Sequence, residues 1–186
     1  GAAEWSIPST VTSVATTVDT GKAAVDLVKT PAAAGTTSAL TTAVDALTGG
    51  AGGDTFTATA ATAASQTLNA GDSVTGGAGA DTLSITASIA GGSTLGAGVT
   101  TSSVETLTVN AVTATTIDAT LMSGVTAITS TGSLGTLTIN TLDTIPSVSV
   151  TSSNVDTTLS YTAATVVGTA DAQTVTLSGV GTTANV

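Results

Sequence analysis

The sequence predicts a mainly β protein, in which short strands wind into a solenoid-like stack after a short N-terminal helix. Hydrophobic residues make up 41% of the chain and aromatic residues only 2%, and this mixture of Val, Ile, Leu and Thr favours strands. From about residue 36, short alternating runs are separated by Gly, Asn, Asp and Ser turns, a pattern typical of closely spaced strands. Before residue 31, apolar residues recur at helical spacing.

The first 34 residues are predicted to form a separate N-terminal segment with a helix over residues 9–30. Asp19 and Lys22 are placed where opposite charges support a helix, and Pro31 would end it. The apolar stripe of this helix packs either on its own domain or on a neighbouring subunit as an assembly contact, and the sequence favours neither. The stripe consists of Val11, Val14, Val18, Gly21, Val25 and Val28.

Residues 35–186 are predicted to form one β-rich domain. Their strand-like pieces are short, and most have no helix-length segment between them, which suggests a β-solenoid or β-helix-like stack of coils. A β-sandwich is the alternative all-β arrangement. The clearest strand-like segments are residues 104–110, 127–133, 134–140, 148–153, 158–163 and 174–179.

Composition excludes most catalytic and nucleic-acid-binding classes. The chain has no His and no Cys, so zinc sites, thiol nucleophiles and imidazole acid–base chemistry are absent. With 2 Lys and Arg against 12 Asp and Glu, the net charge is -10, which is unsuited to binding phosphates. No apolar run is long enough for a transmembrane helix. We therefore expect a non-enzymatic protein without catalytic residues.

Two nine-residue segments follow the pattern G-G-x-G-x-D-x-U-x, where U is a large apolar residue. Residues 49–57 read GGAGGDTFT, and residues 76–84 read GGAGADTLS. Asp45 and Asp72 fall in the same nine-residue register in degenerate copies, whereas Ala63 occupies the one position where Asp is missing. Four aspartates in phase indicate a repeated unit rather than isolated glycine turns.

This pattern indicates a parallel β-roll with calcium-binding turns, because glycines let turn carbonyls point at an ion and Asp supplies hard oxygen ligands. If two nonapeptides make one coil, Asp54 pairs with Asp72, while Asp45 and Asp81 lie on the other side. We expect one or two sites; the alternative is ordinary glycine turns with solvated aspartates. The predicted metal-binding residues are Gly49, Gly50, Gly52, Asp54, Asp72, Gly76, Gly77, Gly79, Asp81 and Asp45.

The remaining carboxylates are expected to have local roles. Glu105 begins a strand-like run and is predicted to be a solvated strand-end carboxylate rather than a metal ligand. Four aspartates lie beside turn residues, where capping of local turns is the expected role and additional calcium sites are the alternative. They are Asp118, Asp143, Asp156 and Asp171.

The two nonapeptides resemble the RTX family of secreted calcium-binding repeats. Residues 36–186, including the threonine-rich VETLTV at 104–109, look like RTX-containing bacterial surface-layer (S-layer) proteins. The resemblance implies secretion, calcium-dependent folding, and self-assembly into an array or filament on the outer surface of a bacterial cell. Cell-surface polysaccharide is a further candidate partner. Two alternatives stay open: the repeat region of a type-I-secreted adhesin, and that of a secreted hydrolase whose catalytic domain is absent from this chain.

Net charge gives an independent reason to expect calcium to matter. An acidic chain so poor in cations repels itself when compact, and an ion bound only by the folded chain contributes folding free energy. Extracellular calcium modules work at roughly 10⁻⁴–10⁻³ M, so such sites would fill outside the cell.

Overall fold

A computed structural model describes residues 33–62, 64–89 and 92–181. These residues belong to one compact unit, Ala33–Val186, and the regular structure of the described ranges consists of strands only. The predicted helix over residues 9–30 lies outside the described residues.

The strands form three sheets. The seven-stranded sheet contains β1 (Thr37–Ala39), β3 (Thr55–Ala60), β5 (Thr82–Ala87), β8 (Thr106–Ala111), β10 (Ala127–Thr131), β12 (Ser147–Thr151) and β14 (Val175–Ser178). The four-stranded sheet contains β6 (Ser93–Leu95), β9 (Thr115–Asp118), β11 (Leu137–Leu142) and β13 (Thr157–Tyr161). The three-stranded sheet contains β2 (Ala46–Thr48), β4 (Ser73–Thr75) and β7 (Thr100–Ser102).

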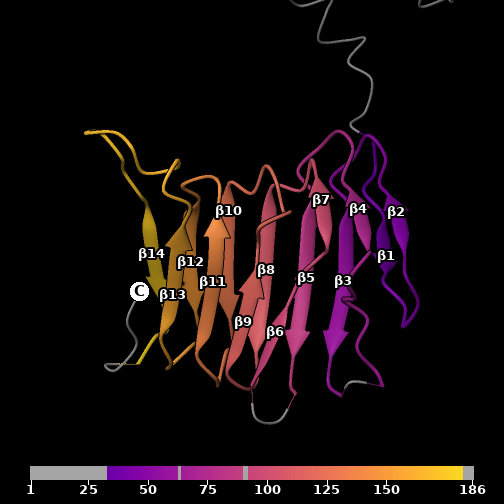
Figure 1. Cartoon of the computed structure of the whole chain (residues 1–186), viewed down its shortest axis with the longest axis horizontal. Helices are drawn as coiled ribbons and strands as arrows, with labels where there is room; N and C mark the ends of the chain where they lie inside the picture. The colour runs from indigo at the N-terminus through magenta and orange to yellow at the C-terminus, as the bar shows by residue number, and fades with distance from the viewer. Residues whose placement is uncertain (1–32, 63, 90–91, 182–186) are drawn as a thin grey trace, which may run out of the picture. The chain divides into compact units, whose positions relative to one another are not determined.

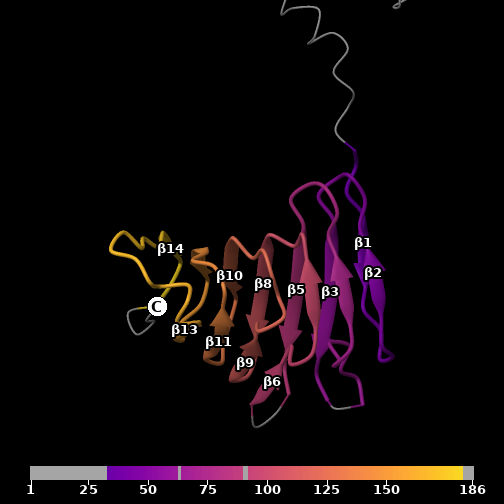
Figure 2. The same cartoon turned by 45° about the horizontal axis from the view of Figure 1, so that its top comes forward.

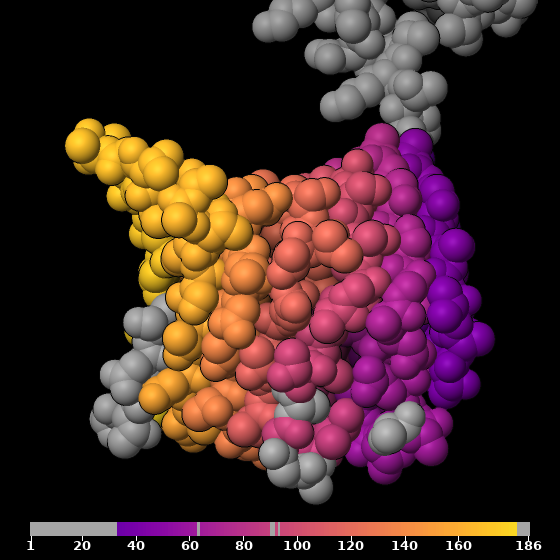
Figure 3. Space-filling model, viewed as in Figure 1, coloured from indigo at the N-terminus to yellow at the C-terminus, as the bar shows by residue number. Residues whose placement is uncertain are grey.

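Every pairing between these strands is parallel, and strands that are neighbours in a sheet come from successive coils. The chain is therefore a β-solenoid of about six turns, as the sequence predicts, and the β-sandwich is excluded. The coils stack side by side along the long axis of the unit (Figure 1 and Figure 2). In the space-filling view they follow one another in sequence order, from indigo to yellow (Figure 3).

All six of the clearest strand-like segments contain a strand, with bounds that differ by a few residues. Residues 104–110 contribute to β8, residues 127–133 to β10, and residues 134–140 to β11. The three later segments contain β12, β13 and β14.

The prediction that two nonapeptides make one coil is wrong after the first coil. The first step along the seven-stranded sheet does span two nonapeptides, since Thr36 and Asp54 are paired at a separation of 18 residues. The next step spans 27 residues, from Asp54 to Asp81, and the one after it 24, from Asp81 to Glu105. The long coil carries an extended loop after β3, in which Leu68 is buried with 1% of its surface exposed.

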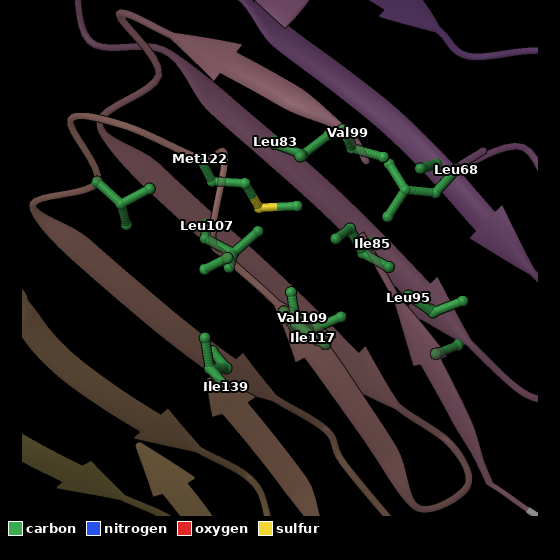
Figure 4. Packing of buried hydrophobic residues seen from close by; sticks show 14 of the residues in the cluster. Leu68, Leu83, Ile85, Leu95, Val99, Leu107, Val109, Ile117, Met122 and Ile139 are labelled. Carbon is green, nitrogen blue, oxygen red and sulfur yellow. The ribbon is translucent and has the colours of Figure 1, made fainter. Parts of the chain in front are cut away.

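The core is a set of aligned columns between the sheets, because alternate side chains of every strand point inward. Along the seven-stranded sheet one column contains Phe56, Leu83, Leu107, Ile128 and Val148, each at most 2% exposed. The facing side chains come from the four-stranded sheet, as with Leu95, Ile117 and Ile139, and from segments between strands, as with Leu68, Val99 and Met122 (Figure 4). The labelled members are Leu68, Leu83, Ile85, Leu95, Val99, Leu107, Val109, Ile117, Met122 and Ile139.

Candidate functional site

The two nonapeptides lie in adjacent coils, and the glycine turn of each ends with an aspartate directly before a strand of the seven-stranded sheet. The backbone N–H of Asp54, before β3, donates to Oδ1 of Asp81, before β5, at 2.7 Å. The backbone N–H of Asp81 donates in turn to Oε2 of Glu105, before β8, at 2.8 Å. We call Asp54, Asp81 and Glu105 the carboxylate ladder.

This arrangement corrects the predicted pairing of the aspartates. Asp54 stacks on Asp81 and not on Asp72, because the coil between them contains three nonapeptide lengths. Asp72 instead accepts a hydrogen bond at Oδ1 from the backbone N–H of Asp45, at 2.8 Å. Asp45 and Asp72 precede β2 and β4, so they belong to the edge of the three-stranded sheet. Ala63, the position that lacks Asp, lies outside the described residues.

Asp54 has both carboxylate oxygens hydrogen-bonded to its own and the preceding coil. Its Oδ1 accepts from the backbone N–H and the hydroxyl of Thr36, both at 2.6 Å, and its Oδ2 accepts from the N–H of Gly50, at 2.6 Å. The Thr36 hydroxyl, followed by the N–H groups of Gly50 and Thr36, lowers the pKa of the Asp54 carboxyl below its ordinary value of 3.8. Asp54 thus acts as a charged cap of the first glycine turn.

The carboxylate oxygens of Asp45 and Asp72 also accept hydrogen bonds. The N–H of Thr41 donates to Oδ2 of Asp45, at 2.6 Å. The N–H of Asn69 donates to Oδ2 of Asp72, at 2.6 Å, while Oδ1 accepts from Asp45. Three of the four aspartates in register therefore accept hydrogen bonds from neighbouring backbone N–H groups, and two of them, Asp54 and Asp72, are buried rather than solvated.

Asp81 differs from the other three in one oxygen. It is fully buried, as Asp54 and Asp72 are, but its Oδ2 has no hydrogen-bond partner within the described structure. A buried carboxylate oxygen without a partner carries a desolvation cost that a donor or a cation would offset. Both Oδ2 of Asp81 and the carbonyl oxygen of Ser103 lie within 2.4 Å of the point where a Cβ on Gly76 would sit. Two acceptor oxygens therefore converge beside the second glycine turn.

The glycines of the two nonapeptides bring neighbouring coils into close backbone contact. A Cβ on Gly49 would lie 2.1 Å from the carbonyl oxygen of Gly76, and one on Gly77 would lie 2.3 Å from that of Gly50. Gly77 also has a φ of +105°, which side chains disfavour. At Gly50, in contrast, the nearest atom would be 3.9 Å away. The tight packing also involves the motif positions Gly52, Gly76 and Gly79.

The donor chemistry at Asp81 fits a hard cation such as calcium, which takes carboxylate and backbone carbonyl oxygens. Among the described residues no three acidic side chains converge to form a metal-binding group. A cation here would therefore be held by one carboxylate and carbonyls of the glycine turns. The structure brings Gly76, Ser103 and Asp81 together, and it separates Asp45 and Asp72 from them at another sheet edge.

Two further carboxylates can be compared with their predicted roles. Glu105 is not simply solvated, because it accepts from the N–H of Asp81 as the last rung of the ladder. The sequence signal that could have identified it is its place directly before a strand-like run, as for Asp54 and Asp81, since its separation of 24 residues from Asp81 breaks the nine-residue register. Asp118 caps a local turn as predicted: it accepts from the N–H of Thr120 at 3.0 Å, and the hydroxyl of Thr120 is the main cause of its lowered pKa.

Comparison with family models, curated proteins and solved structures gave no match to this chain. The described part of the chain contains no helix that could cross a lipid bilayer.

Proposed function

We propose that the chain is a non-enzymatic, extracellular structural protein that self-assembles into a bacterial cell-surface array or filament. In this proposal calcium binds at the glycine turns and promotes folding and assembly. The resemblance of the nonapeptides to secreted RTX repeats gives the compartment and the ion.

The observation that carries the assembly proposal is the exposed end of the core at β14. Val175 lies in register with the buried Val148, and Leu177 lies in register with the buried Val150. Val175 is nevertheless 43% exposed and Leu177 50% exposed. These two side chains continue the core columns and lack a further coil to cover them within the described residues.

The outer edge of β14 adds to this. No described strand pairs with that edge, and all four residues of β14 are exposed. An unpaired strand edge is a template for another strand, and a solenoid joined end to end to a second copy would bury its apolar columns. We propose that the first coils of another copy, which carry β1 and β2, cover this end.

Calcium is supported by the unpartnered Oδ2 of Asp81 and by the charge of the chain. A net charge of -10 opposes both compact folding and the approach of a second copy. A cation held by Asp81 and the carbonyls around Gly76 would remove part of that repulsion. Binding that occurs only in the folded chain also stabilises the fold.

Electron microscopy and light scattering of the 186-residue chain, first with excess calcium and then with a chelator, test the proposal. Ordered arrays or fibres that dissolve on chelation are expected. Leu177→Lys should abolish them, because the charge is placed on the exposed end of the core. The matched control is Leu134→Lys, since Leu134 is 72% exposed in the loop before β11.

Dispersed monomers in both solutions would contradict assembly and would favour the repeat region of an adhesin or of a secreted hydrolase. Assembly that ignores calcium and chelator would remove the ion from the proposal while leaving the structural role. Equal loss of assembly in both leucine variants would show that β14 is not the contact.

A further inference from the structure

The outward face of the seven-stranded sheet is a regular array of small hydroxyl side chains. On the five strands β3, β5, β8, β10 and β12, three columns of outward residues run across the coils in register. Ten of the fifteen positions are Thr and three are Ser. We call these fifteen positions the threonine face: Thr55, Thr57, Thr59, Thr82, Ser84, Thr86, Thr106, Thr108, Asn110, Ala127, Thr129, Thr131, Ser147, Ser149 and Thr151.

The register of the threonine face stays the same from coil to coil, whereas the number of residues in each coil changes. The coil step falls from 27 residues between β3 and β5 to 24 between β5 and β8, and the chain exchanges the three-stranded sheet for the four-stranded one. The outward residues of the seven-stranded sheet stay in register through these changes. The variation in length is confined to the loops and the other sheets.

Ten of the thirteen hydroxyls of the threonine face have no hydrogen bond within the described structure. Ser147 donates to the carbonyl oxygen of Thr126 at 3.3 Å, and Ser149 bonds to Thr151 at 3.4 Å. Threonines in the turns behave differently: the hydroxyls of Thr36 and Thr120 bond to carboxylates. The face therefore presents free donors and acceptors, and β-branching limits the rotamers in which they are held.

The face is also neutral, although the chain is strongly acidic. None of its fifteen residues is ionisable, and the carboxylate ladder lies just outside it, before the strands. The outward side of the four-stranded sheet also has one column of threonines, Thr94, Thr116, Thr138 and Thr158, but it carries a charge, because Asp118 lies outward in β9. A charged ligand would gain nothing from the threonine face, whereas a neutral hydrogen-bonding surface would match it.

The spacing of the array defines that surface. Neighbouring strands are about 4.8 Å apart, and alternate residues along a strand are about 6.6 Å apart. A two-dimensional array of hydroxyls with these repeats is close to the spacing of water oxygens on a face of hexagonal ice. Each threonine also presents a methyl group, which favours ordered water around it.

We propose that the threonine face binds ice. Its hydroxyls anchor a layer of water in positions shared with the crystal, and its methyl groups hold the water between them in order. The face contains no aromatic residue on which a sugar ring could stack. Packing against a second copy would bury hydroxyls that have no partners, which is unfavourable. This proposal is independent of calcium binding and assembly.

The test is partition of the 186-residue chain between liquid and a slowly growing ice crystal, with an unrelated acidic protein of similar size as the baseline. The wild type should be enriched in the ice severalfold over the baseline. Thr108→Lys, in the middle of the face, should reduce this enrichment to the baseline. Thr138→Lys, the same substitution at an outward position of β11, should retain it.

Circular dichroism melting of both variants shows that their fold is intact. The proposal is overturned if the wild type partitions like the baseline protein, or if the two lysine variants behave alike. It is also overturned if Thr108→Lys affects only binding to cell-surface polysaccharide or association between copies, with ice enrichment unchanged.

Discussion

Asp81 lies fully buried beneath the second glycine turn, with its Oδ1 accepting the backbone N–H of Asp54 at 2.7 Å and its Oδ2 left without a partner. The two aspartates occupy equivalent positions in identical-looking motifs, yet only Asp54 has both oxygens hydrogen-bonded. The difference between them separates a structural cap from a candidate calcium ligand.

Asp81→Asn is expected to abolish the stabilisation by calcium. The amide keeps an oxygen for the N–H of Asp54 and removes the buried charge, so in chelator the melting temperature should equal or exceed that of the wild type. With calcium, the wild type should gain stability and the variant should not. Asp54→Asn is the matched control: it should melt several degrees lower in both solutions, because one amide oxygen cannot accept from both Thr36 and Gly50. A melting temperature of the wild type that is the same with calcium and with chelator would contradict this prediction.

Stability in acid should depend on the cap at Asp54. The folded state lowers the pKa of this carboxyl below 3.8, mainly through the hydroxyl of Thr36. The contribution is therefore fully present above pH 3.8 and is lost as the pH falls through the folded-state pKa. Thr36→Val should raise the pKa toward 3.8 and reduce the acid dependence of the melting temperature.

A carboxyl NMR titration of Asp54 measures that shift directly. Thr55→Val is the control, because the hydroxyl of Thr55 makes no hydrogen bond within the described residues. An unchanged titration in Thr36→Val would show that the backbone N–H groups alone set the pKa.

Gly76→Ala should be strongly destabilising, because its Cβ would lie 1.7 Å from the carbonyl oxygen of Ser103. Overpacking of this kind costs about 1–3 kcal/mol or more. Gly50→Ala changes a glycine of the first nonapeptide, where the nearest atom to the new Cβ would be 3.9 Å away. It should change the free energy of unfolding by less than about 0.5 kcal/mol. Urea unfolding of both variants measures the difference. If both are equally damaging, the motif glycines are needed for something other than coil contact.

Ser133→Ala should destabilise the later coils. The Oγ of Ser133 accepts the backbone N–H of Ala111 at 3.1 Å in a fully buried position, and losing that partner costs about 1–3 kcal/mol. Ser130→Ala is the control, since the Oγ of Ser130 contacts only the hydroxyl of Ser133. Equal urea midpoints for the two variants would rule out a special role for Ser133.

The sequence predicted the strands well because alternation of apolar and polar residues is a local property. Residues 127–133 alternate in this way, and β10 lies within them. Coil length could not be predicted in the same way. The nine-residue repeat of the sequence continues through the loop after β3. The described residues of this loop form no strand and instead bury Leu68, and no local sequence pattern distinguishes a buried loop from a strand here. The partners of Asp54 and Asp72 were wrong for the same reason.

The glycine turns were predicted, whereas the difference between Asp54 and Asp81 was not. The two motifs read almost alike, and the contrast lies within the turns themselves. The N–H of Gly50 donates to Oδ2 of Asp54, whereas Gly77, at the equivalent position with a φ of +105°, leaves Oδ2 of Asp81 without a partner. Glu105 was missed as a ladder member because no glycine motif precedes it, and only its place before β8 relates it to the aspartates.

Every rung of the carboxylate ladder has the same orientation: the N–H of Thr36 serves Asp54, that of Asp54 serves Asp81, and that of Asp81 serves Glu105. The ladder therefore has a direction: its N–H groups point toward the C-terminal coils and its carboxylates toward the N-terminal coils. In the proposed assembly, where β14 of one copy meets the first coils of the next, all copies would point the same way, and a fibre would have two chemically different ends that elongate at different rates.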